Sequence, residues 1–217
     1  MPQPTIIVKI TASVQNGFPF VQREKTMPRI QPVDRNRLDQ DTLSLLKAKS
    51  GTDDTRWNVF EGVANSPATL RGITSLGDSI KQGLSSLEYE VIAIEMARFN
   101  GCGYCLPAHR YVCSKIGVDA ADIDAMTRGE LLTQKPHLMV IQQFVRAVLE
   151  NKGHLDDDEF RDFESRRITH DKMIVILSEI ALYTFLNYFN RLAGTEIEAQ
   201  VLPHVSEQAE WITAPDR

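Results

Sequence analysis

The sequence predicts an all-α protein, a helical bundle with a short non-helical arm at its N-terminus. Residues typical of helix N-termini recur along the chain. Ser85 and Glu88, for example, have the spacing of a capping box. Glycines such as Gly83 and Gly194 follow apolar segments and mark helix ends. Hydrophobic residues occupy 42% of the 217 positions, which is enough for one compact core.

Each expected helix is supported by its own start or end. Ser66 and Pro67 supply an N-cap and a first helical residue, while Asp119 and Thr169 cap two later helices. The acidic cluster at 156–159 indicates another helix start rather than a calcium site, because negative charge is favourable there. We therefore expect helices at 38–49, 67–82, 85–99, from 103 or 104 onward, at 119–126, at 137–151, from 156 onward and at 169–191.

Residues 1–26 form the expected arm, and residues 27–217 form the helical domain. Within the arm, the β-branched run at 5–11 has the composition of a strand. The arm either packs on a neighbouring subunit or is an extension ahead of a start at Met27, and the sequence supports both readings equally.

Composition argues against several classes of function. A net charge of -5 with scattered basic residues disfavours nucleic-acid binding. The longest apolar region, at 173–186, contains Ser178, Glu179 and Thr184 and indicates a buried helix rather than a membrane span. No basic segment followed by an apolar one signals secretion, and three cysteines fit a reducing compartment. We therefore expect a cytoplasmic protein with no membrane partner.

The most informative segment, at 100–109, holds two cysteines and a histidine. Pro107 lacks a backbone N–H and is tolerated in the first turn of a helix, so a helix begins near residue 103 or 104. Cys102 then lies in the turn, and Cys105 lies in the first helical turn, where the helix dipole favours a thiolate. His109 follows Cys105 by four residues and can accept the thiol proton directly or through one water.

Glu90 is the carboxylate expected to complete this site. At about 100° per residue it points toward the core, whereas Glu95 and Arg98 fall on a more polar side of the same helix. A buried charge needs a hydrogen-bonding partner, and a histidine that must be oriented would suit it. The alternative is that Glu90 pairs with an arginine or caps a neighbouring helix.

The pattern of these residues resembles the AhpD-like superfamily, which contains alkylhydroperoxidases and carboxymuconolactone decarboxylase-like proteins. Its motif is E-x11-C-x2-C-x3-H, and the resemblance covers about residues 27–203. Tyr104 stands where some members have a second histidine, and we expect Tyr104 to have a packing role. The decarboxylases of the superfamily lack the cysteine pair, which argues against lactone decarboxylation. All four motif positions are filled here, by Glu90, Cys102, Cys105 and His109.

The resemblance implies an all-helical oligomer that reduces peroxides or disulfides through its cysteine pair, and we expect no metal or other cofactor. By position, Cys105 would attack the oxygen of a hydroperoxide substrate. Cys102 would be the resolving thiol, exposed enough for an external thiol or dithiol reductant to reach it. Glu90 would orient His109 and complete a proton relay.

The last expected helix has two notable features. It is apolar on much of its circumference, which together with the resemblance indicates a homo-oligomer. Asn187 and Asn190 lie near its end, where they either line a pocket or belong to the helix termination.

Three alternatives to peroxide reduction stay open. The same residues could serve a disulfide reductase that supports a separate peroxidase, or a regulatory oligomer that senses redox state without turnover. A zinc site could use Cys102, Cys105, His109 and Glu90. Cys113 cannot join Cys105 in such a site, because eight helical residues separate them by about 12 Å, and we expect it to be a small buried apolar residue.

Overall fold

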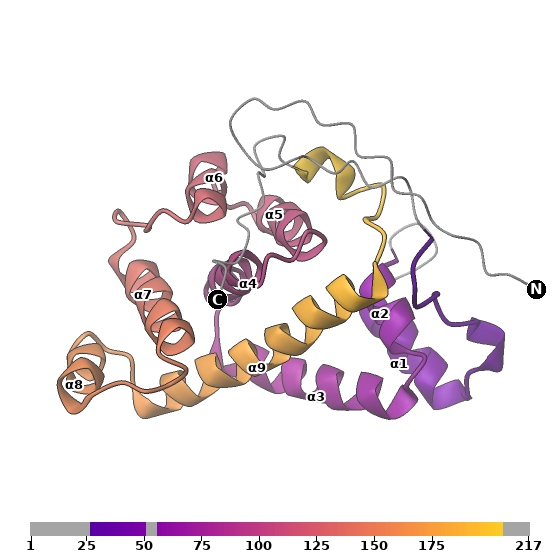
Figure 1. Ribbon diagram of the computed structural model, residues 1–217, viewed down its shortest axis with the longest axis horizontal. Helices are drawn as coiled ribbons and strands as arrows, with labels where there is room; N and C mark the ends of the chain where they lie inside the picture. Colours follow the sequence, from indigo (N-terminus) through magenta and orange to yellow (C-terminus); the bar gives the residue numbers. More distant parts are fainter. Residues whose placement is uncertain (1–26, 51–55, 206–217) are drawn as a thin grey trace, which may run out of the picture.

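The computed structural model describes residues 27–50 and 56–205, and these residues form an all-α fold with no strand. Figure 1 shows an arrangement of helices in which the long α9 runs from beside α8 to α2. The described helices are α1 (Gln40–Ser50), α2 (Asn58–Val63), α3 (Pro67–Gly83), α4 (Ser86–Phe99), α5 (Cys105–Lys115), α6 (Ala120–Arg128), α7 (Pro136–Glu150), α8 (Asp157–Ser165) and α9 (His170–Ala193), with one-turn 3-10 helices η1 (Arg35–Arg37) and η2 (Leu202–His204).

The helix starts confirm all but one of the predicted caps. Ser85 and Glu88 form a complete capping box at α4, and Asp156 forms one with Glu159 at α8. The Thr169 hydroxyl accepts the backbone N–H of Lys172 at the start of α9. Asp119 precedes α6 as expected, although its side chain makes no capping hydrogen bond. The six-residue α2 was not predicted, because it is too short for a periodic pattern to be visible.

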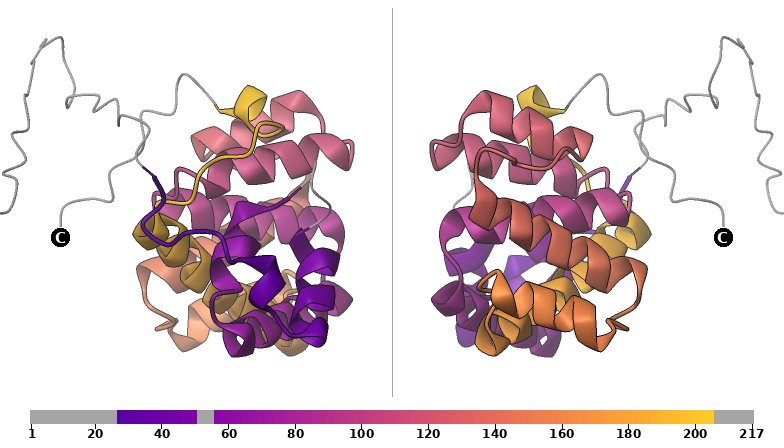
Figure 2. Two further views of the ribbon diagram at one scale, coloured as in Figure 1. Left: turned by 90° about the vertical axis from the view of Figure 1, so that its right-hand side faces the viewer. Right: turned by 90° about the vertical axis from the view of Figure 1, so that its left-hand side faces the viewer.

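Helix α4 is the centre of the fold. It packs against α5, α6, α7 and α9, and α9 also runs along α3 (Figures 1 and 2). Every residue of α4 from Glu90 to Ala97 is buried. A helix covered on all sides has no solvent-facing stripe, so every polar side chain on it needs a partner inside the protein.

Glu95 shows the consequence: it lies on a polar side of α4 as expected, but this side is buried against α7. Its side chain is 3% exposed, and its two carboxylate oxygens accept hydrogen bonds from the Arg146 guanidinium at 2.6 and 3.0 Å. Gln142 and Arg98 complete this buried network between α4 and α7. The neighbouring helix α7 therefore supplies much of the polar environment on this side of α4.

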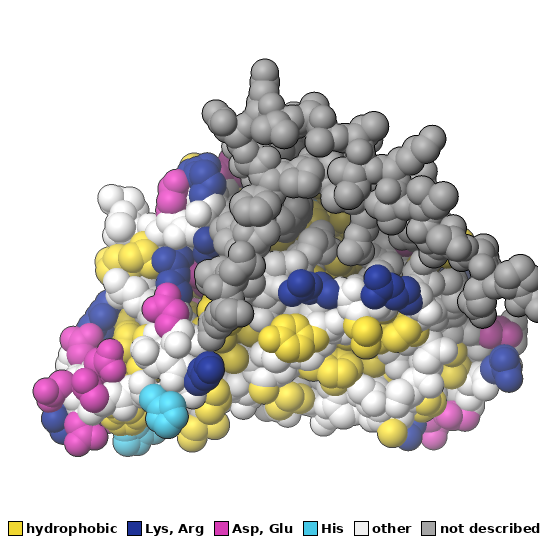
Figure 3. Space-filling model, viewed as in Figure 1, with side chains coloured by type: hydrophobic (Ala, Val, Ile, Leu, Met, Phe, Trp, Pro, Cys, Tyr) yellow, Lys and Arg dark blue, Asp and Glu magenta, His cyan; other side chains and the backbone are white. Residues whose placement is uncertain are grey.

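Helix α9 has a buried side and an exposed side. Half of its most apolar window is buried, as in the core helix of a soluble protein, although its length and composition would also allow it to cross a membrane. Figure 3 shows hydrophobic side chains gathered along this part of the surface. The large apolar residues exposed on α9 are Ile174, Leu177, Phe185, Tyr188 and Leu192. The expected strand at 5–11 lies outside the described residues.

Candidate active site

The turn between α4 and α5 places the cysteine pair. Gly101 adopts a positive φ of 60°, which favours glycine, and reverses the chain after α4. The backbone N–H of Cys102 donates to the Ala97 carbonyl at 2.9 Å, which fixes the turn onto the end of α4. Helix α5 then begins at Cys105, and Pro107 lies in its first turn as predicted.

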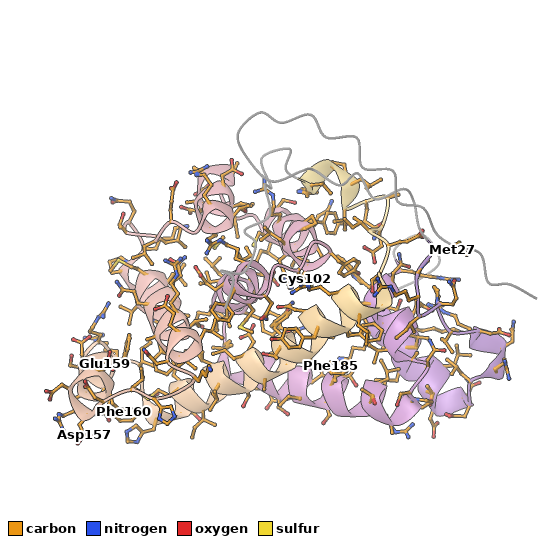
Figure 4. The ribbon with its side chains drawn as sticks, in the orientation of Figure 1. Met27, Cys102, Asp157, Glu159, Phe160 and Phe185 are labelled. Atoms are coloured by element: carbon orange, nitrogen blue, oxygen red, sulfur yellow. A yellow bond between two sulfur atoms is a disulfide. The ribbon has the colours of Figure 1, made fainter. Side chains whose placement is uncertain are left out.

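Cys102 and Cys105 are joined in a disulfide, which Figure 4 shows between α4 and α5. The Cys105 backbone N–H at the start of α5 donates to Cys102 Sγ at 3.2 Å. The start of α5, where the helix dipole is expected to favour a Cys105 thiolate, therefore presents a backbone N–H to Cys102 in the disulfide state. Cys102 is 0% exposed and Cys105 is 3% exposed. The expectation of an accessible Cys102 is wrong here, because the turn carries its side chain inward into the core.

Glu90 and His109 meet as the sequence predicted. The Glu90 Oε2 atom lies 2.7 Å from His109 Nδ1, and both side chains are mostly buried. The ring of Tyr183 on α9 packs edge-on against the His109 ring, with 5.0 Å between centroids. This contact and the carboxylate fix the imidazole in one orientation, leaving Nε2 as its second nitrogen. In the described part of the chain, His109 makes no hydrogen bond to either sulfur.

Two further contacts at the cysteine pair were not predicted. The Asn190 Nδ2 amide on α9 donates to Cys105 Sγ at 3.4 Å, and this side chain is 4% exposed. The Tyr104 hydroxyl donates to Glu198 Oε1 at 2.6 Å, and that oxygen also accepts the backbone N–H of Asn58. Tyr104 is therefore more than a packing residue, because it ties the start of α5 to the segment after α9.

Burial sets the titration of the other ionisable groups near the site. Burial and the nearby Glu90 raise the pKa of Glu179 to about 10, and neither of its carboxylate oxygens has a hydrogen-bonding partner among the described residues. Burial and Glu90 also raise the pKa of the Cys113 thiol to about 12. Cys113 is free and fully buried, in keeping with the small apolar role expected for it.

The described residues contain no group of three His, Cys, Asp or Glu side chains arranged to hold a metal ion. In the oxidised pair each sulfur is already bonded to the other, so the four side chains considered for zinc do not form a ligand set here. A cavity of about 150 Å³ opens beside Met27, Asn58 and Glu196, and neither cysteine lines it.

Known proteins resemble this chain in sequence. The carboxymuconolactone decarboxylase family matches residues 67–135, a segment that contains the whole Glu90 to His109 motif. The alkyl hydroperoxide reductase AhpD of Hyphomonas neptunium is 28% identical over 116 residues, which is 50% of this chain. The chain spans only 62% of the length of that relative.

Solved structures share the fold at low sequence identity. A peroxidase-related protein from Ralstonia eutropha JMP134, described as an alkylhydroperoxidase AhpD core, superimposes with a TM-score of 0.72 at 17% identity, covering 84% of this chain and 99% of that one. A peroxidase-related protein from Silicibacter sp. TM1040 gives 0.67 at 18% identity, covering 82% and 97%. The debrominase Bmp8, in complex with 2,3,4-tribromopyrrole, gives 0.63 at 18% identity, covering 81% and 95%.

Proposed function

We propose that this chain, a member of the AhpD-like superfamily, is a thiol-dependent peroxidase that reduces an organic hydroperoxide with Cys102 and Cys105. The single observation that supports this most strongly is the 2.7 Å contact between Glu90 and His109, next to a cysteine pair joined in a disulfide. A carboxylate that orients an imidazole next to a thiol is the arrangement that activates a cysteine nucleophile.

The reduced enzyme begins the proposed cycle. The Cys105 thiol passes its proton to His109 Nε2, directly or through one water, while Glu90 stabilises the imidazolium through Nδ1. The thiolate attacks the terminal oxygen of the hydroperoxide, the O–O bond breaks, and the alkoxide takes the proton from His109. Cys105 is left as a sulfenic acid and the substrate leaves as an alcohol.

The resolving step gives the disulfide found in the structure. The Cys102 thiol attacks the Cys105 sulfenic sulfur, and the thiol proton leaves with the sulfenic hydroxyl group as water. An external thiol or dithiol then reduces the disulfide and restores both thiols. Because neither sulfur is exposed, this reductant requires a local opening of the site. In this proposal the protein is a cytoplasmic homo-oligomer in which the exposed apolar side of α9 is covered by another subunit.

The first experiment treats the reduced protein with one equivalent of an organic hydroperoxide. The tryptic peptide 99–110 contains Cys102 and Cys105 and excludes Cys113. We expect this peptide to lose two hydrogens, since the pair closes to a disulfide. An unchanged dithiol would contradict the proposal and favour a non-peroxide substrate.

Substitutions then separate the roles of the residues. Cys105→Ser should abolish hydroperoxide consumption, and Cys102→Ser should allow one oxidation without resetting. His109→Gln should raise the pKa of the Cys105 thiol, because the proton acceptor is lost. The matched control is Cys113→Ser, which should keep most of the activity. Consumption of the reductant with an added disulfide substrate, without hydroperoxide consumption, would instead identify a disulfide reductase.

A further inference from the structure

Among the described residues, Asn190 is the one side chain outside the predicted motif that hydrogen-bonds to a sulfur of the pair. Its Nδ2 atom donates to Cys105 Sγ at 3.4 Å, within reach for a hydrogen bond to sulfur. The other end of the same amide, Oδ1, is buried and has no hydrogen-bonding partner among the described residues. Buried amide oxygens are nearly always paired, so this one points to a missing partner.

Helix termination does not account for this side chain. At the C-terminus of α9 the backbone carbonyl of Asn190 accepts the N–H groups of Gly194 and Thr195. The cap therefore uses main-chain atoms alone, and the side-chain amide is left to face the cysteine pair. Asn187, one turn earlier, is also buried, but its amide meets Asn100 at 2.9 Å instead of a sulfur.

We propose that Asn190 is a catalytic residue of this thiol chemistry, with its Nδ2–H holding the Cys105 thiolate and its Oδ1 accepting the O–H hydrogen of a bound hydroperoxide. This inference rests on the proposed function. The proposal makes the substrate the missing hydrogen-bonding partner of Asn190 Oδ1. The side chain at this position must then carry both a donor and an acceptor. A primary amide carries both on adjacent atoms.

The attack geometry explains why both ends of the amide are needed. The hydroperoxide oxygen that the thiolate attacks is the terminal one, which carries the hydrogen. As the S–O bond forms and the O–O bond breaks, this oxygen keeps its hydrogen and becomes part of the sulfenic acid, while the alkoxide takes its proton from His109. An amide bound to sulfur through N–H and to the transferred O–H through its carbonyl therefore matches the transition state and the sulfenic acid product.

The neutral charge of asparagine also matters at this position. Hydrogen bonds to the charged form of a group lower the pKa of an acid, so Asn190 should favour the Cys105 thiolate. An aspartate of nearly the same shape would place a negative charge against the thiolate and have no amide hydrogen to donate. The two substitutions Asn190→Ala and Asn190→Asp therefore test the donor and the charge separately.

The test uses the full chain with Cys102→Ser as background, so that Cys105 is the thiol that titrates near neutral pH. Cys113, with a pKa of about 12, stays protonated in this range. Thiolate absorbance at 240 nm gives the pKa of Cys105, and a stopped-flow assay gives the rate constant for oxidation by cumene hydroperoxide. The matched control is Asn187→Ala, which removes a buried asparagine from the same helix without touching a sulfur.

We expect Asn190→Ala to raise the pKa of Cys105 by about one pH unit, and Asn190→Asp to raise it further. At a pH where the thiolate is fully formed, both should still react with the hydroperoxide roughly tenfold more slowly, since the lost contacts to the transition state are independent of ionisation. Asn187→Ala should leave the pKa of Cys105 unchanged and this rate within about twofold of the background protein, because the Asn187 amide contacts Asn100 and not a sulfur.

Two results would overturn the assignment of Asn190. One is a Cys105 pKa that is unchanged in both Asn190 variants. The other is a rate that recovers fully once the thiolate is formed, which would remove Oδ1 from the reaction. The titration needs no peroxide. It therefore tests whether Asn190 donates to the Cys105 thiolate even if the wild-type protein consumes no hydroperoxide and the proposed function fails.

Discussion

Glu179 is fully buried and has no ion-pair or hydrogen-bonding partner among the described residues, and replacing it with glutamine should change how stability depends on pH. The side chain is 0% exposed, and both carboxylate oxygens lack a hydrogen-bonding partner in the described part of the chain. Burial, followed by the negative charges of Glu90 and Glu88, raises its pKa from 4.5 to about 10, and Lys81 offsets only part of this effect. At neutral pH the folded protein therefore holds Glu179 as an uncharged acid.

The direction of the effect follows from the two pKa values. An acid whose pKa is raised by folding stabilises the native state fully below pH 4.5, and this contribution is lost as the pH rises toward 10. The unfolded chain ionises Glu179 above pH 4.5, while the folded chain does not. Between pH 4.5 and pH 10, each pH unit lowers the free energy of unfolding by about 1.4 kcal/mol. The free energy of unfolding has therefore fallen by roughly 3 kcal/mol at pH 7.

Glu179→Gln has nearly the same shape and cannot ionise, so it removes this loss. Urea unfolding, followed by circular dichroism on the oxidised proteins, should be measured every half unit from pH 4 to pH 8. The free energy of unfolding of Glu179→Gln minus that of the wild type should grow by roughly 3 kcal/mol between pH 4 and pH 7. Any cost of burying the amide is independent of pH and cancels in this comparison. Parallel stability curves for the two proteins would refute the argument that Glu179 is neutral in the fold.

Two further predictions concern Glu88 and the outer side of α9. Although burial raises the pKa of Glu88, the Ser85 N–H, Lys172 and His137 lower it to about 2, so its stabilisation is present above pH 4.5 and lost as the pH falls toward 2. Glu88→Gln should remove this acid sensitivity, on the order of 2 kcal/mol after solvent screening, in urea unfolding between pH 5 and pH 2.5. Wild-type protein should scatter light as an oligomer of its 24.5 kDa chain, and Tyr188→Glu should dissociate it; a wild type that is monomeric at every concentration would contradict the oligomer.

Much of the fold was predictable because its signals are local. A capping box such as Ser85 with Glu88 needs only four residues to be recognised, and the structure has it in full. The contact between Glu90 and His109 was also predictable, since helical periodicity placed one residue toward the core and the motif placed the other at the cysteine pair. The burial of Glu95, by contrast, was not predictable from the sequence. Whether a helix has a solvent-facing side depends on how many helices surround it, and the sequence of α4 does not contain that information.

The contacts that complete the site depend on packing between segments far apart in the chain. Tyr104 meets Glu198 across 94 residues, and Cys105 meets Asn190 across 85. The sequence identified Asn187 and Asn190 as candidates for a pocket, but three residues on a helix differ by only about 60° in direction, so periodicity cannot choose between them. The rotation of α9 against α4 and α5 decides it, because it turns Asn187 toward Asn100 and Asn190 toward the sulfur. Since the long-range packing of α9 selects the residue, the proposed donor to Cys105 should be more sensitive to changes in α9 packing than the Glu90 to His109 pair is.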